Sequence, residues 1–169
     1  MENVVLLGYD ENGNLVSFRL DGENPDVPGS ANNVRLCEAV RTLDAKDRPT
    51  SIDRLWFDPA TQVAIDDGHS ITQIAYTDTS QVEAVIDDLG RVRLMTYDGA
   101  NRLSQRTDPK NNTVTLSYDG NSAVIGTTEV DKSDLGNPDL TRVTTIGRDN
   151  LERTISATDS IGKDRKSVV

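Results

Sequence analysis

A pair of residues that recurs about every 20 positions is the feature that most constrains what this chain can fold into. A second series of aspartates lies roughly midway between these pairs, at Asp67, Asp88 and Asp108. The spacing of the repeat is therefore about ten residues. Repeats of fixed length are typical of proteins in which each unit buries its apolar face against its neighbours, because one unit cannot do so alone. The aligned pairs are Phe57-Asp58, Thr77-Asp78, Tyr97-Asp98 and Tyr118-Asp119, at Asp-to-Asp steps of 20, 20 and 21 residues.

The spacing of the apolar residues predicts the secondary structure within each repeat. From Thr113 to Tyr118 apolar side chains alternate with hydroxyl side chains, and Gln81 to Ile86 nearly does the same. This two-residue period indicates half-buried strands, and helical spacing does not fit. Asp, Gly, Asn and Pro lie between the runs and favour turns. Strands of about six residues joined by turns of about four residues give the observed spacing.

We therefore predict an all-β fold of antiparallel β-hairpin repeats, with negligible helix and with one repeat array over residues 1–169. The predicted strands centre on Val4 to Gly8, Leu15 to Leu20, Val34 to Val40, Ile71 to Tyr76, Val82 to Ile86, Arg91 to Tyr97, Leu103 to Thr107, Thr113 to Tyr118, Thr141 to Ile146 and Arg153 to Ala157.

Each Asp at a strand end has a defined role in this interpretation. Its carboxylate is expected to accept hydrogen bonds from amides one to three residues ahead and so to close the turn. Burying the aromatic ring before it contributes roughly 1.5 to 3 kcal/mol. Replacing Tyr97 or Tyr118 by Ala is therefore expected to cost several times more stability than replacing His69. A polar side chain follows four residues later in Asp10/Asn14, Asp44/Arg48, Asp58/Gln62, Asp98/Arg102 and Asp149/Arg153, where an Arg is expected to pair with the carboxylate.

Three strings resemble the tyrosine-aspartate, or YD, repeats of the RHS family, whose pattern reads Tyr-Asp-x-x-Gly-Arg/Asn-Leu. They are YDENGNLVS (Tyr9 to Ser17), YDGANRLSQRTDP (Tyr97 to Pro109) and VIDDLGRVRLMTYD (Val85 to Asp98). Two further strings, at residues 147–163 and 42–52, resemble worn copies, so the resemblance covers most of the chain. The repeat positions that we predict to be structural are Tyr9, Asp10, Phe57, Asp58, Asp78, Asp88, Gly90, Tyr97, Asp98, Asp108, Tyr118, Asp119, Asp149 and Asp159.

The resemblance implies a curved strip that is part of a β-solenoid or spiral shell, with no catalytic residues in the repeats. Members of the family enclose a toxic cargo or form the barrel of adhesion receptors, which implies a secreted or cell-surface location. The implied partners are neighbouring repeats of the same or a longer chain, and a toxin cargo. The alternative is a surface-displayed repeat module that binds a carbohydrate or a protein. The repeats also run from near Met1 to near Val169, which we take to indicate a fragment of a longer chain.

Unpaired edge strands present free backbone N–H and C=O groups, so we also expect copies of the chain to associate through exposed strand edges. The composition sets further limits. The chain has a formal net charge of -10, which argues against nucleic-acid binding, because that requires clustered Lys and Arg. The apolar run from Val4 to Leu7 is too short for a membrane span. With one cysteine, Cys37, an internal disulfide is excluded.

Two acidic segments depart from the repeat and are predicted to be turns lengthened by insertion, at residues 21–33 and 129–140. The second contains hard oxygen donors of the kind that Ca²⁺ prefers, although it lacks the spacing of an EF-hand loop. We otherwise predict no cofactor. The calcium candidates are Asp131, Asp134, Asn137 and Asp139.

His69 is the only histidine, and Asp66, Asp67 and Ser70 beside it supply the letters of a hydrolytic triad. Adjacent residues of a strand point to opposite faces, so Ser70 cannot serve as the nucleophile of His69 on a regular strand. A thiol pair of Cys37 with His69 requires a spatial meeting for which the sequence gives no indication. We therefore predict that the chain is not an enzyme.

Overall fold

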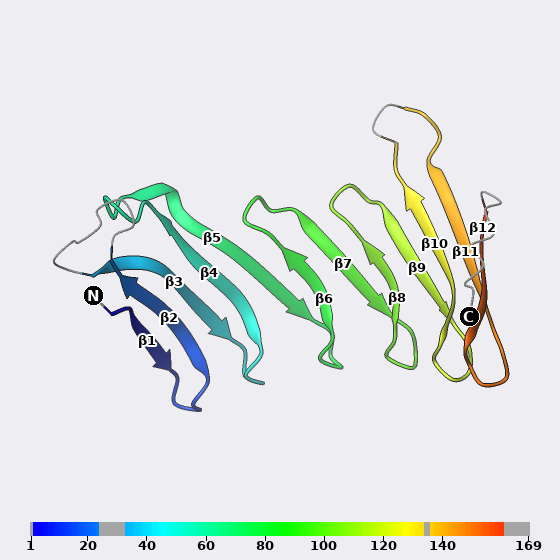
Figure 1. Ribbon diagram of the computed structural model, residues 1–169, viewed down its shortest axis with the longest axis horizontal. Coiled ribbons are helices and arrows are strands. Elements are labelled where there is room, and N and C mark those ends of the chain that lie inside the picture. The colour runs from blue at the N-terminus through cyan, green and yellow to red at the C-terminus, as the bar shows by residue number, and fades with distance from the viewer. Residues whose placement is uncertain (1, 24–32, 134–135, 161–169) are drawn as a thin grey trace. The chain divides into compact units, whose positions relative to one another are not determined.

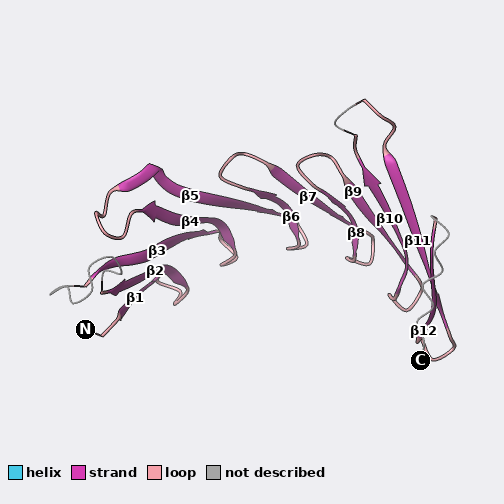
Figure 2. Cartoon of the chain, turned by 45° about the horizontal axis from the view of Figure 1, so that its top comes forward, coloured by secondary structure: helices cyan, strands magenta, loops and turns pink. Residues whose placement is uncertain are grey.

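The computed structural model of the chain describes residues 2–23, 33–133 and 136–160. Within these ranges every regular element is a strand, and no helix occurs (Figure 2). The strands are β1 (Val4–Tyr9), β2 (Leu15–Gly22), β3 (Val34–Leu43), β4 (Pro49–Phe57), β5 (Ala64–Tyr76), β6 (Val82–Ile86), β7 (Val92–Tyr97), β8 (Leu103–Thr107), β9 (Thr113–Tyr118), β10 (Val124–Asp131), β11 (Leu140–Arg148) and β12 (Thr154–Asp159).

Each strand hydrogen-bonds to the strand that follows it in the chain, in the order β1 to β12. The neighbouring strands whose registers are defined pair in the antiparallel direction, as expected for strands joined by short turns. Contacts divide the chain into two compact units, residues 1–75 with 85–91 and residues 76–84 with 92–169. In the second unit, the turns after β7, β9 and β11 all lie at the same end of the strands, and the turns after β8 and β10 lie at the opposite end (Figure 1).

The predicted all-β antiparallel fold is confirmed, and several strand bounds agree closely. Strands β6, β8 and β9 have the predicted limits, and β7 begins one residue later than predicted. Two strands were missed, β4 and β10, together with the first part of β5. Strand β4 begins at a Pro, β10 contains Gly126, and β5 contains the turn-forming letters of Asp66 to Gly68.

Local backbone conformation explains how β5 continues through those letters. Asp66 has φ 56° and Gly68 has φ 84°, both in the left-handed region. The register between β4 and β5 shifts between Leu55 and Phe57, as a bulge requires. The strand therefore absorbs residues that would otherwise end it.

Residues at the ends of both predicted insertions belong to strands. Glu129 to Asp131 belong to β10, and Leu140 begins β11, so the second connection spans residues 132–139. Asp21 and Gly22 belong to β2, and residues 24–32 of the first predicted insertion lie outside the described residues. Ladder pairing of Asp21 and Gly22 with β3, and of Glu129 to Asp131 with β11, extends these strands into the predicted insertions.

The sheet has almost no buried core. Among the described residues, Phe57, with 8% exposure, is the one buried large hydrophobic side chain. The chain exposes 11525 Å² of surface. An ordinary folded monomer of this mass exposes about 8,200 Å² on the scaling of accessible area with mass. Because a compact domain covers each apolar face with a second layer, a sheet this exposed lacks the usual partner layer.

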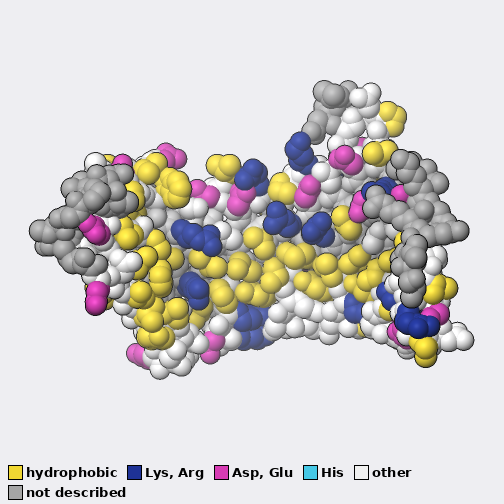
Figure 3. All heavy atoms as spheres, in the orientation of Figure 1, with side chains coloured by type: hydrophobic (Ala, Val, Ile, Leu, Met, Phe, Trp, Pro, Cys, Tyr) yellow, Lys and Arg dark blue, Asp and Glu magenta, His cyan; other side chains and the backbone are white. Residues whose placement is uncertain are grey.

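The two faces of the sheet in the second unit differ in chemistry. On one face β8 to β11 present Arg106, Val114, Glu129 and Arg142 in register. Figure 3 shows hydrophobic side chains gathered with Lys and Arg beside them on one face around β7 to β9. Strand register also fixes which residues lie on the opposite face, and none of these residues is charged. They are Leu94, Thr96, Gln105, Thr107, Thr113, Thr115, Ser117, Gly126, Thr128, Val130, Thr141, Val143, Thr145, Ser156 and Thr158. We call this set the hydroxyl face.

Candidate functional site

The repeated turns share one hydrogen-bond geometry. The N–H of the first residue donates to the carbonyl oxygen of the residue four positions later, and its own carbonyl accepts from the residue three positions later. That third residue has a positive φ in every case, from Gly13 at 84° to Glu152 at 63°. This combination is a type I turn followed by a bulge, the usual three-residue hairpin connection. The turns with this geometry begin at Asp10, Asp44, Thr77, Asp87, Asp98, Asp108, Asp119 and Asp149.

Each aspartate that begins one of these turns accepts two backbone hydrogen bonds, from the amides two and four residues ahead, so the second donor lies one residue beyond the predicted range. In the Asp98 turn, one carboxylate oxygen accepts from the amides of Ala100 at 2.9 Å and Arg102 at 3.0 Å. The other oxygen accepts from Arg102 Nε at 2.8 Å. Asp44 with Arg48, Asp87 with Arg91 and Asp149 with Arg153 repeat this arrangement. The carboxylate thus fixes both the turn and the direction of the arginine.

These hydrogen bonds favour the ionised carboxylate. The side chain of Arg48, together with backbone amides, lowers the pKa of Asp44 to about 2. The side chain of Arg102 lowers the pKa of Asp98, and the side chain of Asn112 lowers that of Asp108, for the same reason. Closure of the turns is therefore linked to ionisation of their aspartates.

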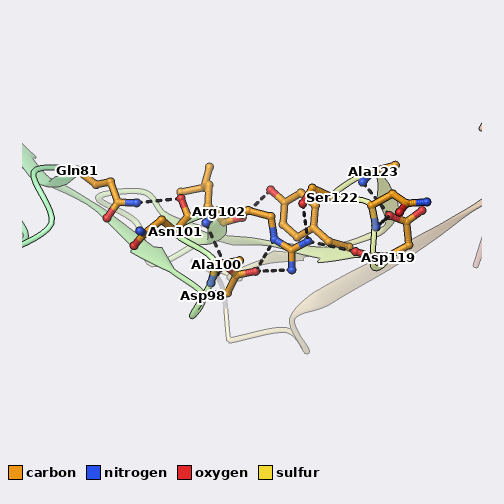
Figure 4. Close-up of polar contacts among 11 residues, drawn as sticks. Gln81, Asp98, Ala100, Asn101, Arg102, Asp119, Ser122 and Ala123 are labelled. Atoms are coloured by element: carbon orange, nitrogen blue, oxygen red, sulfur yellow. Dashed lines mark hydrogen bonds and ion pairs between the residues drawn. The ribbon is translucent and has the colours of Figure 1, made fainter.

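Arg102 joins the Asp98 turn to the Asp119 turn of the next hairpin (Figure 4). Its Nη1 donates to the carbonyl oxygen of Asp119 and to Ser122 Oγ, each at 3.1 Å. Its guanidinium carbon lies 4.4 Å from the centre of the Tyr118 ring. We call the contact among Asp98, Arg102 and Tyr118 the inter-hairpin clamp. It explains why an Arg is placed four residues after an Asp and 16 residues before a Tyr.

The tyrosine hydroxyl completes the connection between hairpins. Tyr118 OH donates to the carbonyl oxygen of Leu103 at 2.8 Å, and Tyr97 OH donates to that of Val82 at 2.8 Å. In both cases the acceptor lies 15 residues earlier, at the start of the preceding even-numbered strand. The turn between β8 and β9 connects the end of β8 to the start of β9. Tyr118 therefore links the start of β8 to the end of β9, which no turn connects.

Arg148 performs the same task in the hairpin of β11 and β12. It occupies the position before Asp149 that corresponds to Tyr97 and Tyr118, and its Nη2 donates to the carbonyl oxygen of Val124 at 3.1 Å. The acceptor follows Asp119 by five residues, as Leu103 follows Asp98. The degenerate repeat at residues 147–163 therefore retains the hydrogen bond to the preceding hairpin, with an arginine in place of the tyrosine.

The first unit has related contacts between hairpins. Asn12 and Asn14 donate to Asp47 Oδ1 at 3.1 Å and 2.9 Å, which links the Asp10 turn to the Asp44 turn. At Phe57 the Arg35 guanidinium lies 3.9 Å from the ring centre, although this Arg comes from β3 and not from a turn. Tyr9 belongs to the first hairpin and its side chain is exposed.

Some predicted repeat positions are placed differently. The turns begin at Thr77 and Asp87, one residue before the predicted Asp78 and Asp88. Asp88 instead accepts from the backbone N–H of Ile71 at 2.7 Å. The side-chain amide of Gln62 donates to the carbonyl oxygens of Pro59 and Arg35 and not to the Asp58 carboxylate. Gly90, three residues after Asp87, is a sequence signal that would have located that turn, whereas Ser80 gives no such signal for the Thr77 turn.

The remaining predicted positions keep simple roles. Asp58 closes a turn that is one residue longer than the others, with Gln62 N–H donating to its carbonyl at 2.8 Å. Gly90 supplies the positive φ of the Asp87 turn, at 71°. Asp159 lies at the end of β12, where its carboxylate accepts from Arg142 at 3.1 Å.

The calcium candidates are not brought together in the described part of the chain. Asp139 pairs with Lys132 Nζ at 2.5 Å, Asp131 lies in β10, and the Asn137 backbone N–H donates to Ser133 Oγ at 3.1 Å. Asp134 lies outside the described residues. Within residues 2–23, 33–133 and 136–160, no group of three or more metal-binding side chains occurs.

His69 contacts Asp53, with 2.7 Å between Nδ1 and Oδ2. Ser70 pairs with Arg54 in the register and His69 with Leu55, so the two neighbours follow the alternation of the ladder. Cys37 is an exposed free thiol. In the described ranges, no helix is long and apolar enough to cross a membrane.

Comparison with known structures gives matches at low sequence identity. One is a crystal structure of TcdB2-TccC3, with a TM-score of 0.42, 10% identity and coverage of 99% of this chain and 11% of that chain. Another is a Tc holotoxin pore from Photorhabdus luminescens with a mutation in TccC3, with a TM-score of 0.42, 10% identity and coverage of 99% and 10%. A third, TcdB2-TccC3-Cdc42, has a TM-score of 0.41, 11% identity and coverage of 99% and 11%.

The chain spans about a tenth of the length of these solved chains, with coverage of 10–11%. No curated protein matches the sequence. Residues 97–133 match the RHS repeat family. This segment begins at Tyr97, contains Tyr118, and includes all three residues of the inter-hairpin clamp. The resemblance to the RHS family is therefore confirmed, with an RHS repeat at residues 97–133.

Proposed function

We propose that this chain is a wall segment of a hollow β-shell or tube of the RHS type, and that it acts mechanically instead of catalysing a reaction. The RHS repeat at residues 97–133 supports this proposal. The wall encloses a cargo, as the family resemblance implies, and works outside the cell that produces it.

The observation that carries the proposal is a sheet that is held together from hairpin to hairpin without a core. Phe57 is the single buried large hydrophobic side chain in the described residues. Stability must therefore come from the strand ladder and from contacts between successive turns, such as the clamp at Arg102. This one-dimensional organisation is typical of repeat proteins, in which each unit contacts only its neighbours.

The difference between the faces also supports a wall. In the second unit the hydroxyl face carries no charge among its register-defined residues, whereas the opposite face carries Arg106, Glu129 and Arg142. A sheet that separates two environments is expected to present different chemistry to each. The exposed strand β1, with Val4 to Leu7 all between 45% and 53% exposed, offers an edge for further strands from this or another chain.

Hydrogen exchange on the intact chain tests the mechanical organisation. In a wall of repeats, Tyr118→Ala lowers amide protection in β8 and β9 while β1 to β3 keep theirs, because stability is transmitted only between neighbours. His69→Ala is the control, and it should leave β8 and β9 unchanged. Uniform loss of protection along the whole chain on replacement of Tyr118 would indicate one cooperative globular unit and refute the proposal.

Light scattering coupled to size exclusion, over a concentration series, tests assembly separately. If edges and faces are covered by further copies, the mass rises above 18.5 kDa with concentration, and electron microscopy shows tubes or closed particles. A monomer at every concentration would exclude self-assembly of this segment.

A further inference from the structure

The turns at Thr77 and Asp98 lack the clamp that joins the turns at Asp98 and Asp119. Position 81 corresponds to Arg102, since each lies four residues after the first residue of its turn, but it holds Gln. Gln81 Nε2 donates to the carbonyl oxygen of Asn101 at 2.8 Å, and its Oε1 accepts from Thr79 Oγ1 at 2.6 Å. The Gln81 side chain, which is shorter than that of an arginine, thus contacts Thr79 of its own turn and the Asn101 carbonyl of the next turn.

A depression of about 350 Å³ lies between these two turns, and Gln81, Glu83, Met95, Tyr97, Asp98 and Asn101 are among its lining residues. Three of them match the groups that Arg102 contacts in the next hairpin. Tyr97 corresponds to Tyr118, Asp98 to Asp119 and Asn101 to Ser122, by their places in the turns. The depression therefore presents the aromatic ring and the acceptors of the clamp without its guanidinium group.

The chemistry of the lining favours a planar cation. A guanidinium group stacks on tyrosine and donates several hydrogen bonds in fixed directions, whereas an ammonium group is a compact point charge. Thr77 replaces the carboxylate of Asp98 in this turn, but the exposed Glu83 adds a carboxylate to the lining. The net charge of -10 also attracts cationic partners.

We propose that this depression binds the guanidinium group of an arginine side chain supplied by a partner polypeptide. The arginine lies over Tyr97, donates to the backbone and side-chain acceptors of Asp98 and Asn101, and is neutralised by Glu83. The assignment does not depend on the proposed wall function, because it follows from comparing two neighbouring pairs of turns in the same unit. It gives this surface a specific class of partner, a polypeptide with an accessible arginine.

Titration of the isotope-labelled chain with N-acetyl-arginine amide, followed by NMR, tests the proposal. Saturating shifts are expected for the Tyr97 ring and for the amides of Gln81 and Asn101. N-acetyl-lysine amide at the same concentrations should give less than about a tenth of those shifts, since it lacks the stacking plane and fork of donors. Glu83→Gln should weaken arginine binding about tenfold through loss of a charge-assisted contact.

Two further variants separate site occupancy from a change in folding. Gln81→Arg supplies the guanidinium group from within the chain, so it should abolish binding of N-acetyl-arginine amide. The NMR resonances of the Tyr97 ring in this variant should lie close to those of the ligand-bound wild-type chain. Asn112→Arg is the matched control, because it places the same side chain four residues after Asp108 in a different turn and should leave binding unchanged. Equal shifts with arginine and lysine, shifts confined to other residues, or unchanged binding in the Gln81→Arg variant would each overturn the proposal.

Discussion

Removing the ring of Tyr118 tests the inter-hairpin clamp most directly. Three contributions are lost in Tyr118→Ala. The hydroxyl donates to Leu103 at 2.8 Å, which is worth about 0.5–1.5 kcal/mol net. The Arg102 guanidinium at 4.4 Å from the ring adds about 0.5–1 kcal/mol. Partial burial of the ring adds about 1–2 kcal/mol, so the free energy of unfolding should fall by about 2–4.5 kcal/mol.

Urea unfolding followed by circular dichroism measures these changes as shifts in midpoint at constant slope. Tyr118→Phe retains the ring and should lose only about 0.5–1.5 kcal/mol, the contribution of the hydroxyl hydrogen bond. His69→Ala is the comparison on another part of the sheet, and its side chain is already 46% exposed, so the loss should be several times smaller than for Tyr118→Ala. Equal losses for Tyr118→Ala and His69→Ala would refute the reasoning, as would a Phe variant as unstable as the Ala variant.

Three other perturbations address the same elements. In a double-mutant cycle, Arg102→Ala and Tyr118→Ala should show a coupling of about 1 kcal/mol, and independent effects would show that the stacking contributes nothing. Because the folded-state pKa of Asp44 is lowered to about 2, the unfolded state binds more protons, and stability should fall as the pH drops from about 5 toward 2. The urea midpoint measured against pH checks this, and Asp44→Asn should flatten the slope. Ser80→Gly should raise stability by about 1 kcal/mol, since φ at Ser80 is 71°, and a lower thermal midpoint would contradict this.

The period of the sequence was enough to predict the strands wherever apolar and hydroxyl residues alternate without interruption. Strands β8 and β9 have the predicted limits because their alternation is local and their turn letters are clear. Strand β10 is not predicted, because its last residues, Glu129 to Asp131, fall in the predicted acidic insertion and Gly126 interrupts the alternation. Its pairing with β9 and β11 outweighs these weak local preferences.

The turns show how a correct motif was assigned one residue too late. The repeat spacing predicts Asp78 and Asp88, yet the chain closes on Thr77 and Asp87, so the presence of an aspartate does not by itself mark the first residue of the turn. The position of the residue with positive φ fixes the turn, and a threonine hydroxyl can replace the carboxylate as the acceptor from Gln81 N–H at 3.1 Å. Residue identity is thus a weaker guide than the spacing to the left-handed residue.

The sequence by itself determined the all-β class, the repeat spacing of about ten residues and the aspartate that closes most of the described turns, because these features depend on contacts within a few residues. Only the tertiary structure decided how hairpins are joined. Arg102 meets the turn of Asp119 17 residues later, Tyr118 reaches Leu103 15 residues earlier, and Arg148 reaches Val124 24 residues earlier. Such contacts form only after strand pairing has brought successive turns to the same end of the sheet's strands. No local sequence pattern therefore specifies them.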